Sequence, residues 1–281
     1  MQLGIFAKTF ARGSVEEVFD AVAAHGLHCV QFNFASAGLP SLPDELEFGV
    51  LERIRGAAAA RRISMAAISG TCNLIHPDPQ QRSEGLQRLR VIISACTYLG
   101  VQIVTLCTGT RDADDMWHAH PENASPESWR DLTSSIEEAL EVADLNMITL
   151  GIEPEINNII DSARSARRLL DEIKSPNLKV ILDAANLIHP DEFPRRNEII
   201  EDAVSLLGED IILAHAKELG RDGHTGGLPL GAGALDWDHY LSLLQLANFN
   251  GPLIMHGFQE HEVAASAAFL LQKDAVGARN A

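Results

Sequence analysis

The chain has 281 residues, of which 46% are apolar, so it can bury a large core. Its 39 acidic residues outweigh the 22 basic ones and give a formal net charge of −17. A protein this acidic repels nucleic-acid phosphates and anionic membrane surfaces, which argues against partners of either kind.

Eight short apolar runs recur along the chain, and amphipathic segments separate them. Most of the runs are bounded by Gly, Asn or Pro, which is typical of buried parallel strands. They predict strands at residues 3–6, 29–32, 64–68, 102–106, 149–152, 179–182, 211–214 and 252–255.

Helical patterns fill the gaps between these runs. Ser14 precedes Val15 and is followed three residues later by Glu17, which predicts a capping box at the start of the first helix. Ser125 and Pro126 indicate another helix start, because proline fits the first turn. The other helices are predicted at residues 57–62, 80–99, 162–173, 197–207, 237–247 and 263–273.

This alternation of strands and helices favours a parallel sheet of the α/β class. A doubly wound sheet is the alternative, but it normally shows a glycine fingerprint after an early strand, and none is visible here. The sequence also shows no linker and no low-complexity tract. We therefore predict a (β/α)8 TIM barrel that forms a single domain over residues 1–281, with its active site at the carboxyl ends of the strands.

Polar residues close the apolar runs on four successive strands. They are Glu153, Asp183, His215 and His256. In a barrel such side chains converge on one pocket. Two carboxylates and two imidazoles suit a divalent metal with open positions for substrate, and the cation offsets the cost of burying the carboxylates. The alternative is that each is a separate strand-end residue that caps a helix or forms a salt bridge.

Further polar residues lie on loops expected at the same end of the barrel. His76, after the third strand, either faces the pocket or stabilises its loop. Asn186, after the sixth, either binds substrate hydroxyls or shapes a turn. The glycine-rich segment, residues 220–233, contains Arg221 and is typical of either a mobile flap or a phosphate-binding loop.

The four cysteines lie far apart and form no CxxC pair, which predicts buried free thiols rather than disulfides or a zinc finger. Cys72 and Cys107 stand at or just past strand ends, but the sequence places no base or partner cysteine beside them. We expect neither to be essential. The first residues are too lightly apolar for a signal peptide, and no run of about 18 apolar residues occurs, so we expect a cytoplasmic protein.

Several motifs in this order resemble those of the xylose-isomerase-like TIM barrel superfamily, in particular its sugar phosphate isomerase/epimerase branch. They are GTCNLIHPD, GIEPEINN, VILDAANLIHP and AHAKEL with the later GAGALDW, and the resemblance covers almost the whole chain. Many members hold one divalent metal through Glu, Asp, His and Glu on strands five to eight. By motif match the first three are Glu153, Asp183 and His215. The fourth is His256, a departure that removes one negative charge and favours softer ions such as zinc.

The resemblance also implies roles for residues around this metal. Glu260, four residues after His256, is a second candidate for the strand-eight role. Lys217 matches the HAK pattern of the branch, and Arg221 stands where ketose epimerases have a substrate-binding arginine. We expect the substrate to be bound by five residues: His76, Asn186, His189, Lys217 and Arg221.

These features predict a metal-dependent isomerase or epimerase of a small sugar, sugar phosphate or polyol-derived hydroxy-carbonyl compound. One divalent ion (Mn, Mg, Co or Zn) would stabilise the enediolate that forms when a carboxylate, first Glu153 and second Glu260, removes a proton. A polyol or keto-acid dehydratase or lyase begins with the same step and is an alternative. A non-catalytic sugar-binding barrel is another. The resemblance is also compatible with a homo-oligomer.

Overall fold

The computed structural model describes residues 1–280, with side chains as far as residue 273. Parallel strands form one closed barrel in chain order, and the first strand pairs with the last. The predicted (β/α)8 fold is therefore confirmed. The strands are β1 (Gln2–Phe6), β2 (Cys29–Phe32), β3 (Ser64–Ser69), β4 (Ile103–Cys107), β5 (Thr149–Glu153), β6 (Leu178–Asp183), β7 (Ile211–Ala216) and β8 (Pro252–Met255).

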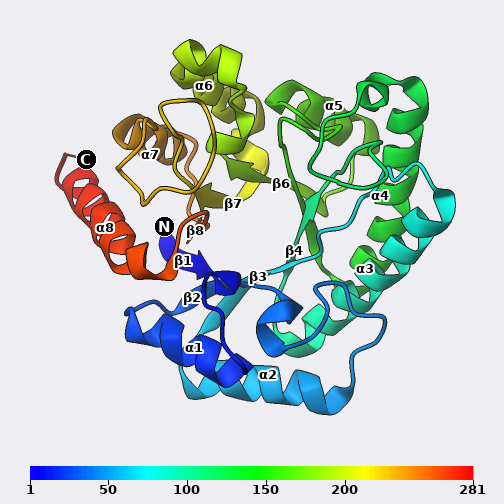
Figure 1. Cartoon of the computed structure of the whole chain (residues 1–281), viewed down its shortest axis with the longest axis horizontal. Helices are drawn as coiled ribbons and strands as arrows, with labels where there is room; N and C mark the ends of the chain where they lie inside the picture. The colour runs from blue at the N-terminus through cyan, green and yellow to red at the C-terminus, as the bar shows by residue number, and fades with distance from the viewer. Residues whose placement is uncertain (281) are drawn as a thin grey trace.

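A helix follows each strand, and the helices form an outer ring around the barrel (Figure 1). The α-helices are α1 (Val15–Ala24), α2 (Phe48–Ala60), α3 (Pro79–Leu99), α4 (Pro126–Asn146), α5 (Ala163–Ile173), α6 (Arg196–Leu207), α7 (Trp237–Leu246) and α8 (Val263–Asn280). Short 3-10 helices lie in the connections: η1 (Ala7–Thr9), η2 (Phe34–Ala37), η3 (Pro121–Ala124), η4 (Ala185–Leu187), η5 (Pro190–Arg195), η6 (Gly208–Asp210) and η7 (Glu260–Glu262). Over the described residues, none of the helices has the length and apolar character needed to cross a membrane.

The helix starts follow local capping chemistry where the sequence supplies it. The Ser14 hydroxyl accepts the backbone N–H of Glu17 at 3.3 Å, and the Glu17 carboxylate accepts that of Gly13 rather than that of Ser14. Helix α2 begins at Phe48, well before the predicted start at residue 57. The residue before it, Glu47, makes no side-chain cap. The local sequence therefore carried no start signal for this helix.

Two layers of side chains fill the barrel interior. The lower layer is apolar and fully buried, and consists of Cys29, Ala67, Ile181, Leu213 and Ile254. Side chains alternate along a strand, so the residue two positions on from each of these faces the same interior. In every case that residue is polar: Gln31, Ser69, Asp183, His215 and His256. The strands thus place a polar layer on an apolar floor, at the carboxyl end of the barrel.

Candidate active site

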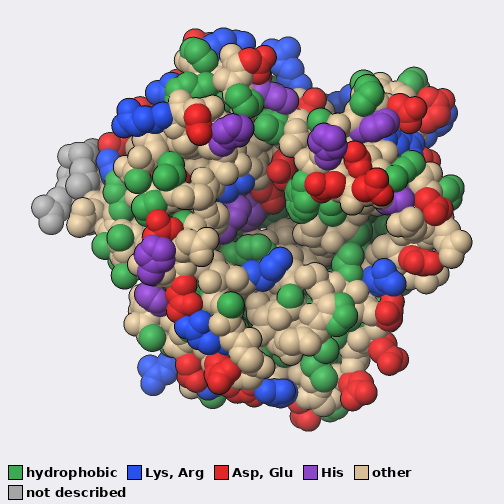
Figure 2. Space-filling model, viewed as in Figure 1, with side chains coloured by type: hydrophobic (Ala, Val, Ile, Leu, Met, Phe, Trp, Pro, Cys, Tyr) green, Lys and Arg blue, Asp and Glu red, His purple; other side chains and the backbone are tan. Residues whose placement is uncertain are grey.

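A hollow lies over the middle of the barrel at this end. Its wall toward β6 and β7 carries histidine, acidic and basic side chains (Figure 2). Glu153 ends β5, Asp183 ends β6, His215 lies on β7, and His256 directly follows β8. Asp183 and His215 are register partners on neighbouring strands, so their side chains leave the barrel wall at the same height.

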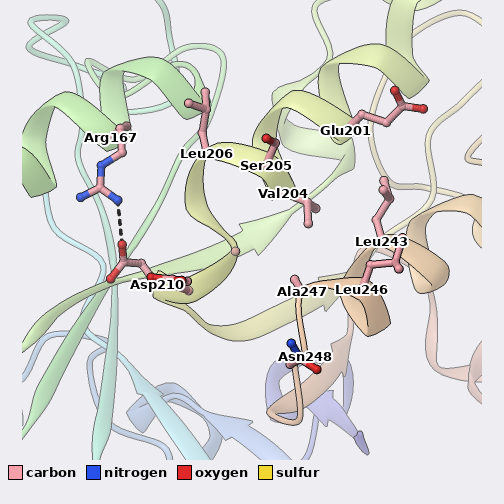
Figure 3. Close-up of a pocket in the computed structure, with 12 residues that line it drawn as sticks. Arg167, Glu201, Val204, Ser205, Leu206, Asp210, Leu243, Leu246, Ala247 and Asn248 are labelled. Carbon is pink, nitrogen blue, oxygen red and sulfur yellow. Dashed lines mark hydrogen bonds and ion pairs between the residues drawn. The ribbon is translucent and has the colours of Figure 1, made fainter.

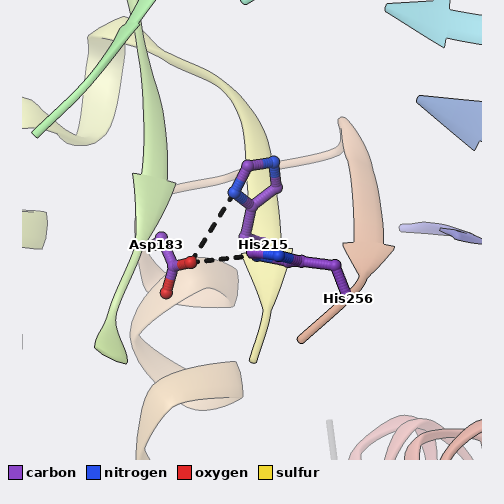
Figure 4. A group of neighbouring side chains, drawn as sticks. All are labelled: Asp183, His215 and His256. Atoms are coloured by element: carbon purple, nitrogen blue, oxygen red, sulfur yellow. Dashed lines mark hydrogen bonds and ion pairs between the residues drawn. The ribbon is translucent and has the colours of Figure 1, made fainter. Parts of the chain in front are cut away.

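The side chains of Asp183, His215 and His256 converge (Figure 4). Nε2 of His256 lies 3.0 Å from Oδ2 of Asp183. Nδ1 of His215 lies 3.7 Å from the same oxygen and 3.3 Å from Oε1 of Glu153. One ligand atom from each of Asp183, His215 and His256 lies within 4.8 Å of the other two.

This donor set fits a divalent metal ion. Ligand atoms about 2.1 Å from a tetrahedral ion are separated from one another by about 3.4 Å. The separations of 3.0, 3.3 and 3.7 Å between the donor atoms already bracket that value. Carboxylate oxygens and imidazole nitrogens are also ligands that zinc, cobalt and manganese accept. The residues would therefore hold an ion with only small side-chain adjustments.

Burial disfavours the charged forms of these groups, and their mutual interactions decide the outcome. For His215, the carboxylates of Glu153 and Asp183 outweigh burial and raise its pKa to about 9. For Asp183, burial is outweighed by Lys217 and by hydrogen bonds from the two histidines, and its pKa falls well below the usual range. Burial and the charge of His215 lower the pKa of His256. Without a metal, the positive charges of protonated His215 and Lys217 thus offset the negative charges of the buried Asp183 and Glu153 carboxylates.

Lys217 and Asn186 complete the polar cluster. The Asn186 amide donates to Oε1 of Glu153 at 2.8 Å, and its oxygen accepts from the ammonium of Lys217. The same ammonium lies 3.3 Å from Asp183. Gly257 has a φ of +83°, and a Cβ there would lie 2.8 Å from Cγ of Lys217. Any larger residue at position 257 would therefore collide with the aliphatic part of the Lys217 side chain.

Gln31 was not among the residues singled out from the sequence. It is a lone polar residue in the run CVQF, and its side chain is buried against His215. Nε2 of His215 lies 2.9 Å from Oε1 of Gln31. The amide nitrogen donates to Ser69 and Thr105, each at 3.1 Å. A single glutamine inside an otherwise apolar strand was the signal that could have identified it.

A second carboxyl group lies near Glu153. Burial and the charge of Glu153 raise the pKa of Glu155 to about 7. Two buried thiols are held in their protonated form, because burial raises the pKa of Cys72 to about 12 and that of Cys107 well above its usual value. These thiols are poor nucleophiles and poor ligands.

Four other candidates lie outside the cluster. Glu260 is in η7 and forms an ion pair with Arg12. Both ring nitrogens of His76 contact backbone groups: one lies 3.2 Å from the Ala113 carbonyl in the loop after β4, and the other accepts the backbone N–H of Asp78 at 3.1 Å. His189 lines a surface pocket between the loops that follow β5 and β6, and Arg221 is exposed. Their predicted roles in substrate binding and catalysis stay predictions.

A buried carboxylate organises the glycine-rich segment. Glu218 is 1% exposed and accepts four N–H groups. The donors are the backbone of Gly231 at 2.6 Å, that of Leu219 and Leu235 at 3.1 Å each, and the Trp237 indole at 2.9 Å. These N–H groups are therefore not free to bind a phosphate.

A surface pocket of about 540 Å³ lies between α6 and α7 (Figure 3). Its residues include Asp210 and Asn248, which precede β7 and β8, so it lies at the amino ends of these strands. Asp210 forms an ion pair with Arg167 there at 2.8 Å. In barrel enzymes the chemistry takes place at the opposite end, so we do not assign the active site to this pocket.

The fold and this cluster define a TIM barrel with carboxylates and imidazoles gathered at its carboxyl end. The family model described as xylose isomerase-like TIM barrel matches residues 19–273, and the chain belongs to this family. No curated protein sequence matches the chain.

Solved structures with this fold cover nearly the whole chain. A 3-keto-D-glucoside 4-epimerase from E. coli is 17% identical, with a TM-score of 0.75 over 97% of this chain and 99% of that one. A D-allulose 3-epimerase from Methylomonas sp. in complex with D-allulose is 15% identical, with a TM-score of 0.75 over 97% and 96%. An IOLI protein with a bound zinc atom is 15% identical, with a TM-score of 0.75 over 97% and 98%.

Proposed function

We propose that the protein is a metal-dependent epimerase or isomerase of a small sugar or a polyol-derived hydroxy-carbonyl compound. The convergence of Asp183, His215 and His256, with Glu153 in contact with His215, is the observation that supports this most. Membership of the family agrees with it. So do the sugar epimerases among proteins of the same fold, and the zinc in one of them.

A divalent cation held by these residues would stabilise the negative charge that develops on a substrate oxygen when a neighbouring C–H proton leaves. Glu153 is the base, because the Asn186 amide holds its Oε1 and leaves Oε2 for the substrate. The proton moves to the carboxylate, and the C–H electron pair remains on the substrate as an enediolate. Return of the proton to the neighbouring carbon isomerises the sugar. Inversion at the same carbon requires a proton from a second acid on the other face of the enediolate, and the proton on Glu153 then passes to solvent.

Lys217 and Asn186 support this proton transfer. The lysine ammonium reaches the cluster from the end of β7 and adds positive charge beside the carboxylates. Donors that are fixed in place before the reaction stabilise developing charge without reorganisation. The Asn186 amide fixes the orientation of the Glu153 carboxylate, so the free oxygen keeps one direction.

Metal content tests the first part of the proposal. We expect protein purified without chelator to carry about one divalent ion per chain, and an Asp183→Ala variant to carry almost none. Asp191→Ala, an exposed acidic residue on η5, is the matched control and should retain the ion. Equal metal content in all three proteins would contradict the assignment. So would full activity of a metal-free, chelator-treated enzyme.

Solvent exchange tests the second part. Turnover of ketoses, aldoses and 3-keto-glucosides in deuterated water should place deuterium on the carbon that changes configuration or becomes a carbonyl. Glu153→Gln should lower kcat by at least about 100-fold, the usual share of a general base. Glu155→Gln, two residues along the chain, is the comparison variant. A larger loss of kcat in Glu155→Gln than in Glu153→Gln would assign the role of base to Glu155. Formation of a dehydrated product would identify a dehydratase instead.

A further inference from the structure

A hydrogen-bonded chain of side chains crosses the barrel beside the candidate metal site. Gln31 is 4% exposed, and its amide nitrogen donates to Ser69 Oγ and Thr105 Oγ1, each at 3.1 Å. Its amide oxygen lies 2.9 Å from Nε2 of His215. The chain therefore joins β2, β3 and β4 to β7 through the interior of the barrel.

The Gln31 amide turns its nitrogen toward the two hydroxyls and its oxygen toward His215. With both amide protons on Ser69 and Thr105, the oxygen faces His215, where it only accepts. An acceptor at Nε2 keeps a proton on that nitrogen, so the neutral ring has its lone pair on Nδ1. Nδ1 is the atom that lies 3.3 Å from Glu153 and 3.7 Å from Asp183.

We propose that Gln31 is the positioning residue of the metal site, which holds His215 in the tautomer and ring orientation that present Nδ1 to the ion. The inference rests on the proposed metal-dependent function. Histidine ligands generally donate their second N–H to an acceptor, and loss of that acceptor weakens metal binding by about 10–100-fold. Gln31 supplies the acceptor from the opposite side of the barrel.

Zinc affinity measured by competition with a chromophoric chelator tests this role. Gln31→Leu removes the acceptor at similar volume and should bind Zn²⁺ about 10–100-fold more weakly than the wild type. Gln31→Glu keeps an acceptor in place and should bind as tightly or more tightly. Cys29→Ala is the matched control, because Cys29 lies on the same strand in the apolar layer below. We expect its affinity to be unchanged.

Long-range ¹H–¹⁵N NMR of the Zn²⁺-loaded protein supplies a readout independent of activity. Nδ1 of His215 should be the ligand, and the proton on Nε2 should exchange slowly in the wild type and faster in Gln31→Leu. Ligation through Nε2, or wild-type zinc affinity in Gln31→Leu, would overturn the inference and leave the metal site standing. A wild-type protein that binds no Zn²⁺ would overturn the proposed function as well.

A second variant covers the case in which Gln31→Leu does not fold. Thr105→Val removes one of the two acceptors of the Gln31 amide and keeps the side-chain shape. The remaining hydrogen bond to Ser69 orients the amide less firmly, so zinc binding should weaken in the same direction by a smaller factor. Unchanged affinity in Thr105→Val would count against the positioning role.

Discussion

Replacing Glu218 with Gln would keep the shape of a buried side chain and remove half of its acceptors. One carboxylate oxygen accepts from Leu219 and Leu235, and the other from Gly231 and Trp237. Whichever way the new amide turns, two of these N–H groups face an NH₂ group that cannot accept. Each unsatisfied buried donor costs about 1–3 kcal/mol, so the variant loses about 2–6 kcal/mol. At about 2–4 °C per kcal/mol for a chain of this size, Tm should fall by about 10 °C.

Thermal unfolding followed by circular dichroism measures this loss. Asp222→Asn is the matched control, because Asp222 is exposed in the same segment and its hydrogen bond to the N–H of His224 can also be made by asparagine. Its free energy of unfolding should stay within about 0.5 kcal/mol of the wild type. Limited proteolysis should cut the glycine-rich segment sooner in Glu218→Gln, because its anchor is weakened. Equal Tm values for Glu218→Gln and the wild type would refute the anchoring role.

Two further predictions follow from the pKa shifts. The pKa of His215 is raised to about 9 in the folded, metal-free protein, against about 6.5 when unfolded, so its stabilisation is complete below pH 6.5 and is lost as the pH rises through 9. The Tm of metal-free protein should therefore fall over this range, and a decline of the same size in His215→Gln would show that another group is responsible. Cys72→Ser and Cys107→Ser should keep wild-type kcat, because burial holds both thiols protonated. Loss of activity in a folded variant of either kind would contradict this reasoning.

The barrel was predictable because each strand is an apolar run short enough to be bounded on both sides. In such a run a polar residue at the end is conspicuous, which is why Asp183, His215 and His256 could be proposed as one group. The alternation of side chains along a strand is a second reason for grouping these residues, and it too can be read from the sequence. Each of these residues lies two positions beyond a buried apolar residue, and so points into the same interior.

Other parts of the site depend on register and on distant partners. Gln31 could be placed inside a strand, but its contact with His215 requires knowing which strands face each other across the barrel. Glu260 lies four residues beyond His256, yet its carboxylate pairs with Arg12, which is 248 positions away in the chain. Helix α2 begins without a side-chain cap, so composition alone placed its start too late. Nothing local indicates any of these outcomes.

The contact between Gln31 and His215 also bears on the order in which the molecule assembles. The two residues are 184 positions apart, and contacts between distant positions carry a large loop-closure entropy. The first half of the chain contains the amide and its two hydroxyl partners, whereas the histidine and the neighbouring His256 belong to the last two strand regions. A nascent chain that has folded only its first strands therefore lacks the two histidines that would bind an ion. Under the proposed function, metal binding therefore follows closure of the ring by the final strand.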